Sequence, residues 1–140
     1  MKINYNYKNI LRFSIIQYMN YLIPAFTMLS LDSIYLSQIG SNLFGPMVKQ
    51  IQNEKLTLNY YGATICYVLL LIVLYKFIIK EKKSPEDAFL LGFCIYGVFD
   101  STNIAIFKKY QYFPAIVDMG WGGILFYLTT LITYKILKIQ

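Results

Sequence analysis

The sequence predicts an all-α, polytopic integral membrane protein that crosses the bilayer as a four-transmembrane-helix bundle. Of its 140 residues, 57% are hydrophobic and only 14% are charged, whereas ordinary soluble domains carry about 25% charged residues. The apolar residues also gather in long runs, and each run is long enough to cross about 30 Å of hydrocarbon as a helix. Composition and run length together therefore argue against an ordinary soluble domain.

Four apolar segments mark the expected helices, within a single membrane domain that covers residues 1–140. The expected helices span residues 13–36, 58–79, 88–107 and 113–137. The first contains Pro24, which we expect to kink it. A polar connection follows, in which residues 46–56 have the pattern of a short helix lying in the membrane interface. The third helix has a clear start signal, because Ser84 can cap it, Pro85 fits its first turn and two acids come next.

The positive charges predict the orientation of the chain. Nine of the 13 lysines and arginines lie on the side that holds both ends of the chain and the loop 80–87, and the other four lie on the opposite side. Cytoplasmic loops are enriched in these residues, so we expect both termini in the cytoplasm. The net charge of +6 is then explained by topology, and we expect no nucleic-acid partner. The expected partner is the lipid bilayer. The sequence does not decide between a monomer and a homo-oligomer, because four helices of this size enclose little space for a pathway.

Several kinds of chemistry are disfavoured by what the sequence lacks. It has no histidine, which removes the usual zinc sites and the Ser-His-Asp and Cys-His catalytic groups. Cys66 and Cys94 fall inside apolar runs at different depths, so we expect two buried free thiols and no disulfide. We assign no catalytic residue, no metal site and no cofactor.

Three aspartates lie inside the apolar segments, and helix geometry places them in one layer. At 1.5 Å per residue, Asp32, Asp100 and Asp118 lie about 6, 10 and 7 Å from the same, non-cytoplasmic end of their helices. A carboxylate at membrane depth costs roughly 2.5–3.5 kcal/mol on insertion scales, so a chain that keeps one usually uses it. In the remaining helix, Tyr67 reaches the same layer and can donate a hydrogen bond. The sequence therefore predicts a polar centre near one membrane face.

Helical faces support the same centre. At 100° per residue, Tyr96, Asp100 and Asn103 point to one side of the third helix. Lys108 lies two turns beyond Asp100 and is the cation expected to balance the carboxylates, either by pairing or by snorkelling to the interface.

Three short motifs resemble a known family. The segment YGVFDSTNIAIFKKY, from Tyr96 to Tyr110, resembles the Y-x-x-Y-D-x-T-N-x-A-x-x-K-x-W core of the bacterial and viral membrane proteins known as domain of unknown function 2177. DMGWG, from Asp118, matches the D-x-x-W-G of that family, and DSIYL, from Asp32, is similar to its D-x-x-W-L. Tyr35 and Tyr110 stand where the family pattern has tryptophan, and Phe99 where it has tyrosine. The resemblance implies a membrane architecture and candidate residues, and it implies no activity.

Three functions stay open for the polar centre. It can bind a small cation, a proton or a polar solute, which would suit a transporter. It can be the site of a membrane-embedded enzyme that acts on a lipid or a headgroup, or it can serve only to fix helix packing in a structural or assembly protein. The first is the interpretation we carry forward, and its candidate binding residues are Asp32, Asp100, Asn103, Asp118, Trp121, Lys108, Tyr96 and Tyr67.

Overall fold

The computed structural model describes residues 3–139, with side chains from Tyr18 onward. This part of the chain is helical and contains no strand. The elements in order are α1 (Ile3–Tyr35), the π-helical turn η1 (Leu36–Gly40), α2 (Ser41–Gln52), α3 (Tyr60–Leu74), the π-helical turn η2 (Tyr75–Ile79), α4 (Pro85–Ile106) and α5 (Tyr112–Leu137). Within the described residues, four helical segments are long and apolar enough to cross a membrane: Tyr18–Gln52, Tyr60–Ile79, Pro85–Ile106 and Tyr112–Leu137. The predicted fold class is confirmed.

The first helix is much longer than the expected segment 13–36. It begins at Ile3 and continues through η1 into α2, so most of the polar connection expected at 37–57 is helical. Residues 46–52 of the expected interfacial helix 46–56 form the last part of this long helix, and residues 53–56 lie beyond it. The helix ends at Gln52, where Asn53 adopts a left-handed backbone conformation with φ 59°.

Polar side chains explain why the helix continues where a loop was expected. The hydroxyl of Ser37 donates to the Ile34 carbonyl over 3.0 Å, and the hydroxyl of Ser41 donates to the Ser37 carbonyl over 3.3 Å. The Asn42 amide makes the same kind of bond to the Gln38 carbonyl. These side chains bond to the preceding turn of their own helix, so a polar composition did not signal a break.

The other three helices begin and end within three residues of the expected bounds, and side chains cap the starts of α3 and α4. The Ser84 hydroxyl accepts the Asp87 N–H over 3.1 Å while the Asp87 carboxylate accepts the Ser84 N–H, which makes a capping box at the start of α4. The start signal predicted there is confirmed. Asn59 caps α3 in a similar way, because its side-chain oxygen accepts the N–H groups of Tyr61 and Gly62.

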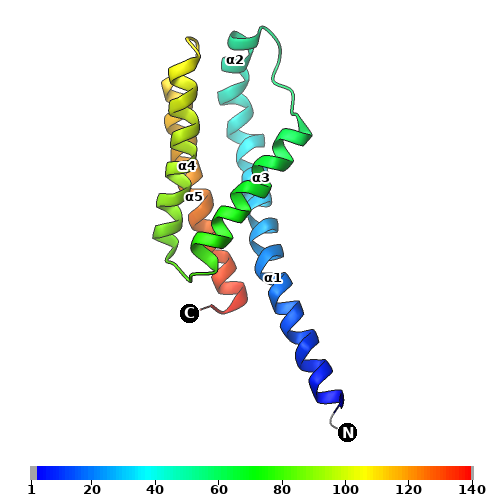
Figure 1. Ribbon diagram of the computed structural model, residues 1–140. Coiled ribbons are helices and arrows are strands. Elements are labelled where there is room, and N and C mark those ends of the chain that lie inside the picture. Colours follow the sequence, from blue (N-terminus) through cyan, green and yellow to red (C-terminus); the bar gives the residue numbers. More distant parts are fainter. Residues whose placement is uncertain (1–2, 140) are drawn as a thin grey trace.

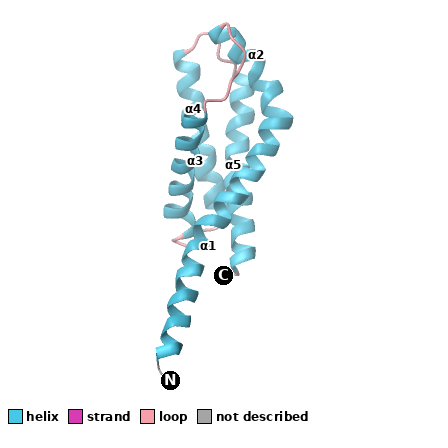
Figure 2. Cartoon of the chain, turned by 90° about the vertical axis from the view of Figure 1, so that its right-hand side faces the viewer, coloured by secondary structure: helices cyan, strands magenta, loops and turns pink. Residues whose placement is uncertain are grey.

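The helices lie side by side with their ends at two opposite faces (Figures 1 and 2). One end holds α2 and the connection between α4 and α5, and the other end holds the turn between η2 and α4 together with the end of α5 (Figure 1). The N-terminal part of α1 extends beyond the other helices in both views.

The closest approach in the bundle is between α4 and α5, where glycines face each other. A Cβ at Gly92 would collide with the backbone oxygen of Gly122, and a Cβ at Gly122 would collide with the ring of Tyr96. A Cβ at Gly123 would lie 2.7 Å from the ring of Phe89. Small residues let membrane helices approach in this way. The close approach fixes the register between the two helices that carry Asp100 and Asp118.

The main apolar core borders the predicted polar layer, because Tyr67, Tyr96 and Trp121 pack against it. Its buried members come from all four helices: Met28, Leu70, Leu74, Ile78, Ile79, Ala88, Leu125 and Phe126. The first part of α3 takes no part in this core, because Tyr61 and Ile65 are 86% and 61% exposed. Helix α3 is therefore packed into the bundle by its second half.

Candidate functional site

Asp32 in α1 is the most completely bonded of the three aspartates. Its Oδ1 accepts the indole N–H of Trp121 over 2.7 Å, and its Oδ2 accepts the hydroxyl of Tyr67. The side chain is 6% exposed. Since each oxygen takes a donor from a different helix, Asp32 ties α1 to α5 and to α3.

Asp118 in α5 makes a second link to α1. Its Oδ1 accepts the hydroxyl of Tyr35 over 3.3 Å. The Tyr35 ring stacks on Trp121 with the ring centroids 4.3 Å apart. The bonds of Asp32 and Asp118 therefore meet at one stacked aromatic pair, which places both carboxyl groups in one layer.

Asp118 also lines a cavity of about 260 Å³. The other lining residues come from α3 and α4 and are mostly apolar: Cys66, Leu70, Ile95, Tyr96 and Phe99. Cys66 and Phe99 are exposed on the outer surface of the bundle. The cavity therefore lies between α3, α4 and α5 and reaches from the carboxyl group toward the lipid-facing side.

Asp100 in α4 is fully buried and only half bonded. Its Oδ1 accepts the hydroxyl of Tyr110 over 2.7 Å, while its Oδ2 has no hydrogen-bond partner among the described residues. Native structures rarely leave a buried polar oxygen unpaired, so such an atom calls for an explanation.

Tyr110 bonds to Asp100 and lies within electrostatic range of Asp118. Burial raises the pKa of Tyr110 above its ordinary value, and the hydrogen bond to Asp100 and the negative charges of Asp100 and Asp118 raise that pKa further. Asn103 opposes this by a hydrogen bond that lowers the pKa of the same phenol. One hydroxyl therefore experiences both carboxylates from a position in the connection between α4 and α5.

With this geometry established, comparison with known proteins identifies the family. The model of a family described as a predicted membrane protein, DUF2177, matches residues 17–135. The chain belongs to the DUF2177 family. The matched range contains the three aspartates and nearly all of the four membrane helices, which supports an integral membrane location. No curated protein and no solved structure matches the chain.

In this DUF2177 chain most of the predicted site residues come together. Tyr67 and Trp121 donate to Asp32, Tyr96 lines the cavity at Asp118, and Asn103 lies beside Tyr110. Their role in binding stays a prediction.

Lys108 differs from the expectation that it balances the carboxylates. Its side chain is exposed, and no ion pair joins it to an aspartate within the described part of the chain. The reason is a tight turn, in which the Tyr110 N–H donates to the Phe107 carbonyl over 3.0 Å. This turn directs Tyr110 back toward Asp100, while the neighbouring Lys109 donates to the Gln50 carbonyl in α2 over 2.9 Å.

Two site residues were missed by the sequence analysis. Tyr35 and Tyr110 stand where the family motifs have tryptophan, and both donate a hydroxyl to a carboxyl group of the centre. The available signal was that an aromatic residue with a hydrogen-bond donor occupies each of these motif positions. A tyrosine keeps the donor that the indole N–H would supply.

The cysteines also differ from the expectation. Cys66 and Cys94 are free, as predicted, but both are exposed on the surface of the bundle rather than buried. Within the described residues, no group of three or more histidine, cysteine, aspartate or glutamate side chains is placed to hold a metal ion.

Proposed function

We propose that this DUF2177 protein binds a proton or another small monovalent cation at Asp100 and Asp118. The observation that carries the proposal is the fully buried Oδ2 of Asp100, which has no partner among the described residues. Removing a carboxylate from water costs several kcal/mol unless a positive charge or hydrogen bonds compensate it. No lysine or arginine of the described residues pairs with the centre, so a proton or small cation is the ligand that fits this oxygen.

Asp118 has room for a ligand beside its carboxyl group, and Asp32 supplies the support. Asp118 accepts one long hydrogen bond and borders a cavity, so a proton or small ion can be held beside it. Both oxygens of Asp32 are already occupied by Trp121 and Tyr67. The three aspartates therefore divide into a pair that binds and one that holds the helices in place.

A monovalent ligand fits better than a divalent metal ion. Divalent metals take four or more ligands, and those that prefer oxygen favour several carboxylates, while the structure offers no suitable group of three. The neutral hydroxyls of Tyr35 and Tyr110 can donate to a carboxylate while leaving its negative charge in place for a proton or a single positive charge.

A specific observation supports transport as an extension of this function. The hydroxyls of Thr129, Thr130 and Thr133 are fully buried in α5 and have no hydrogen-bond partner within the described residues. They lie along the same helix as Asp118, toward the opposite membrane face. Polar groups inside membrane proteins often mark ion or proton pathways, so these hydroxyls favour a route through the bundle over a closed site.

Infrared difference spectra of the carboxyl C=O band test the binding proposal. Protein in lipid nanodiscs is stepped across neutral pH, in sodium and in potassium buffers. We expect a pH- or ion-dependent carboxyl band that is lost in both Asp100→Asn and Asp118→Asn and kept in Asp32→Asn. A folded Asp100→Asn protein with an unchanged spectrum would mean that Asp100 serves packing alone.

The orientation of the bundle is part of the proposal, with both termini and the turn between η2 and α4 in the cytoplasm. The positive-inside rule supports it. Because Cys66 and Cys94 are both exposed, single cysteines are placed in a background that lacks them. An impermeant maleimide applied from outside should label Lys108→Cys and leave Lys83→Cys unlabelled, and the reverse pattern would contradict this orientation.

A further inference from the structure

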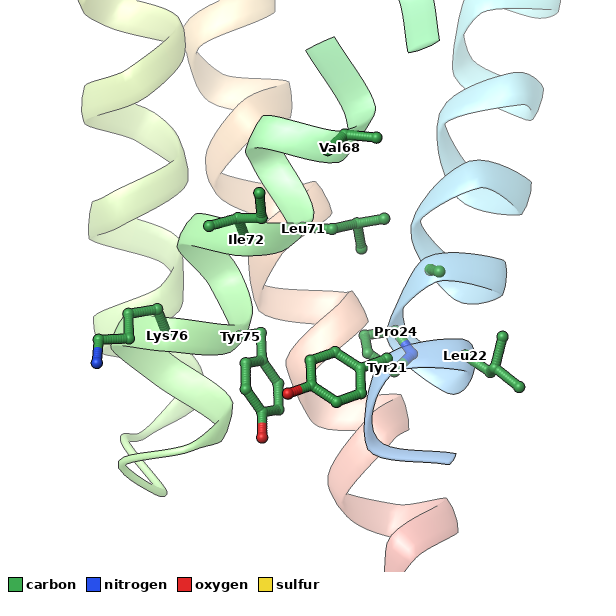
Figure 3. A pocket seen from close by; sticks show the side chains of 9 residues that line it. Tyr21, Leu22, Pro24, Val68, Leu71, Ile72, Tyr75 and Lys76 are labelled. Atoms are coloured by element: carbon green, nitrogen blue, oxygen red, sulfur yellow. The ribbon is translucent and has the colours of Figure 1, made fainter. Parts of the chain in front are cut away.

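A groove between α1 and α3 lies apart from the aspartate centre. Its volume is about 500 Å³, and its walls are almost entirely apolar. Figure 3 shows Val68 and Leu71 of α3 pointing toward α1, with Pro24 and Leu22 on the other side. The shape and the apolar lining of the groove fit a binding site for a hydrocarbon chain.

The groove ends in polar groups at the membrane face that holds the turn between η2 and α4. The rings of Tyr21 and Tyr75 lie there with their centroids 4.2 Å apart. The Tyr75 hydroxyl points toward that face in Figure 3, whereas the Lys76 side chain extends sideways from α3. An apolar groove with a tyrosine hydroxyl at its interfacial end matches an amphiphile, with a chain inside and a headgroup outside.

A second cavity continues from this polar end. It has a volume of about 290 Å³, and Tyr75 lines both cavities. Asn20, next to Tyr21 in the chain, lines the second cavity together with Lys80 and Lys82. Two lysines therefore line the cavity where a headgroup would lie, and no aspartate or glutamate is among the residues that line either cavity.

We propose that this groove binds one anionic phospholipid, with an acyl chain between α1 and α3 and its phosphate at Lys80 and Lys82. Charge complementarity selects the headgroup, because basic pockets between membrane helices bind anionic lipid headgroups. The apolar walls select a lipid over a free phosphate, since a soluble anion would leave the groove above Tyr75 unfilled. The site is independent of the aspartate centre and of any ion bound there.

Native mass spectrometry of the full chain tests the charge at the site. The protein is titrated with phosphatidylglycerol and with phosphatidylcholine carrying the same acyl chains. We expect phosphatidylglycerol to bind about thirtyfold more tightly, on the scale of two lysines near a membrane surface. The double variant Lys80→Gln, Lys82→Gln should bring this ratio close to one. The matched double variant Lys83→Gln, Lys108→Gln, which removes the same charge outside both cavities, should leave it within about twofold of the unmodified protein.

Filling the groove tests the apolar part. Val68→Trp should weaken the binding of both lipids. Ile65→Trp, on the same helix but outside the groove, should weaken the binding of neither. If both lysine double variants lower the preference for phosphatidylglycerol equally, the preference reflects general attraction of the anionic lipid to surface charge, and the proposal is overturned. Competition by soluble glycerol phosphate would show a free phosphate site, and an unaffected Val68→Trp protein would show that no chain enters; either result also overturns it.

Discussion

The indole of Trp121 in α5 donates to the carboxylate of Asp32 in α1 over 2.7 Å, across 89 residues of sequence. The same carboxylate accepts the Tyr67 hydroxyl of α3. This single side chain therefore connects three of the four membrane helices through hydrogen bonds.

Removing one donor from Asp32 should destabilise the bundle. Tyr67→Phe and Trp121→Phe each leave one buried carboxylate oxygen unpaired, and we expect each to lower the free energy of unfolding by about 1–2 kcal/mol. Tyr61→Phe is the control, since the Tyr61 side chain is 86% exposed. Unfolding in mixed micelles followed by circular dichroism gives the values. Equal stability of all three variants would show that Asp32 does not hold the helices.

Adding a methyl group at the contact between α4 and α5 should separate them. Gly92→Ala would place its Cβ against the Gly122 backbone oxygen, which cannot move aside as a side chain can. We expect a loss of about 1–3 kcal/mol in unfolding free energy. Gly120→Ala is the matched control, because no atom lies within 4 Å of its new Cβ. If Gly120→Ala is the more damaging of the two, the close approach of α4 and α5 described above is incorrect.

The phenol of Tyr110 should ionise later than the exposed tyrosines as pH rises. Its pKa is raised in the folded protein, chiefly by burial, so the folded state favours the neutral phenol. The stabilisation is fully present below the ordinary tyrosine pKa of about 10, and it is lost as pH rises through the higher folded value.

Ultraviolet titration at alkaline pH measures this effect as the difference between the unmodified protein and Tyr110→Phe. The difference should correspond to one phenol that titrates above the bulk transition of the remaining tyrosines. Tyr112→Phe is the matched control for the loss of one tyrosine, because Tyr112 is 69% exposed. A Tyr110 that titrates with the bulk would mean that it does not bond to Asp100.

Much of this architecture could be predicted because membrane helices follow from run length. The expected segments 58–79 and 113–137 lie close to the observed α3 with η2 and α5, and helix rise alone placed Asp32, Asp100 and Asp118 in one layer. The membrane requires every backbone group to be satisfied within its own helix, so a long apolar run has few alternatives.

The failures arose where polar residues admit more than one structure. Ser37, Ser41 and Asn42 bond to their own helix, whereas their composition suggested a loop. Lys108 was expected near the carboxylates because of its spacing along a helix, but α4 ends at Ile106 and a turn places Tyr110 there instead. The direction of a side chain after a helix end depends on turn geometry, which helical periodicity cannot supply.

The separation of Asp32 from its partners has a consequence for biogenesis. Helix α1 leaves the ribosome first and Trp121 follows 89 residues later, which takes about 4–18 s at typical synthesis rates of 5–20 residues per second. Tyr67 follows after 35 residues, so the Asp32 carboxyl group has neither donor at first and only one of the two until Trp121 is made. We therefore expect the insertion of α1 to depend on help from the insertion machinery, or on late entry together with the α4–α5 hairpin.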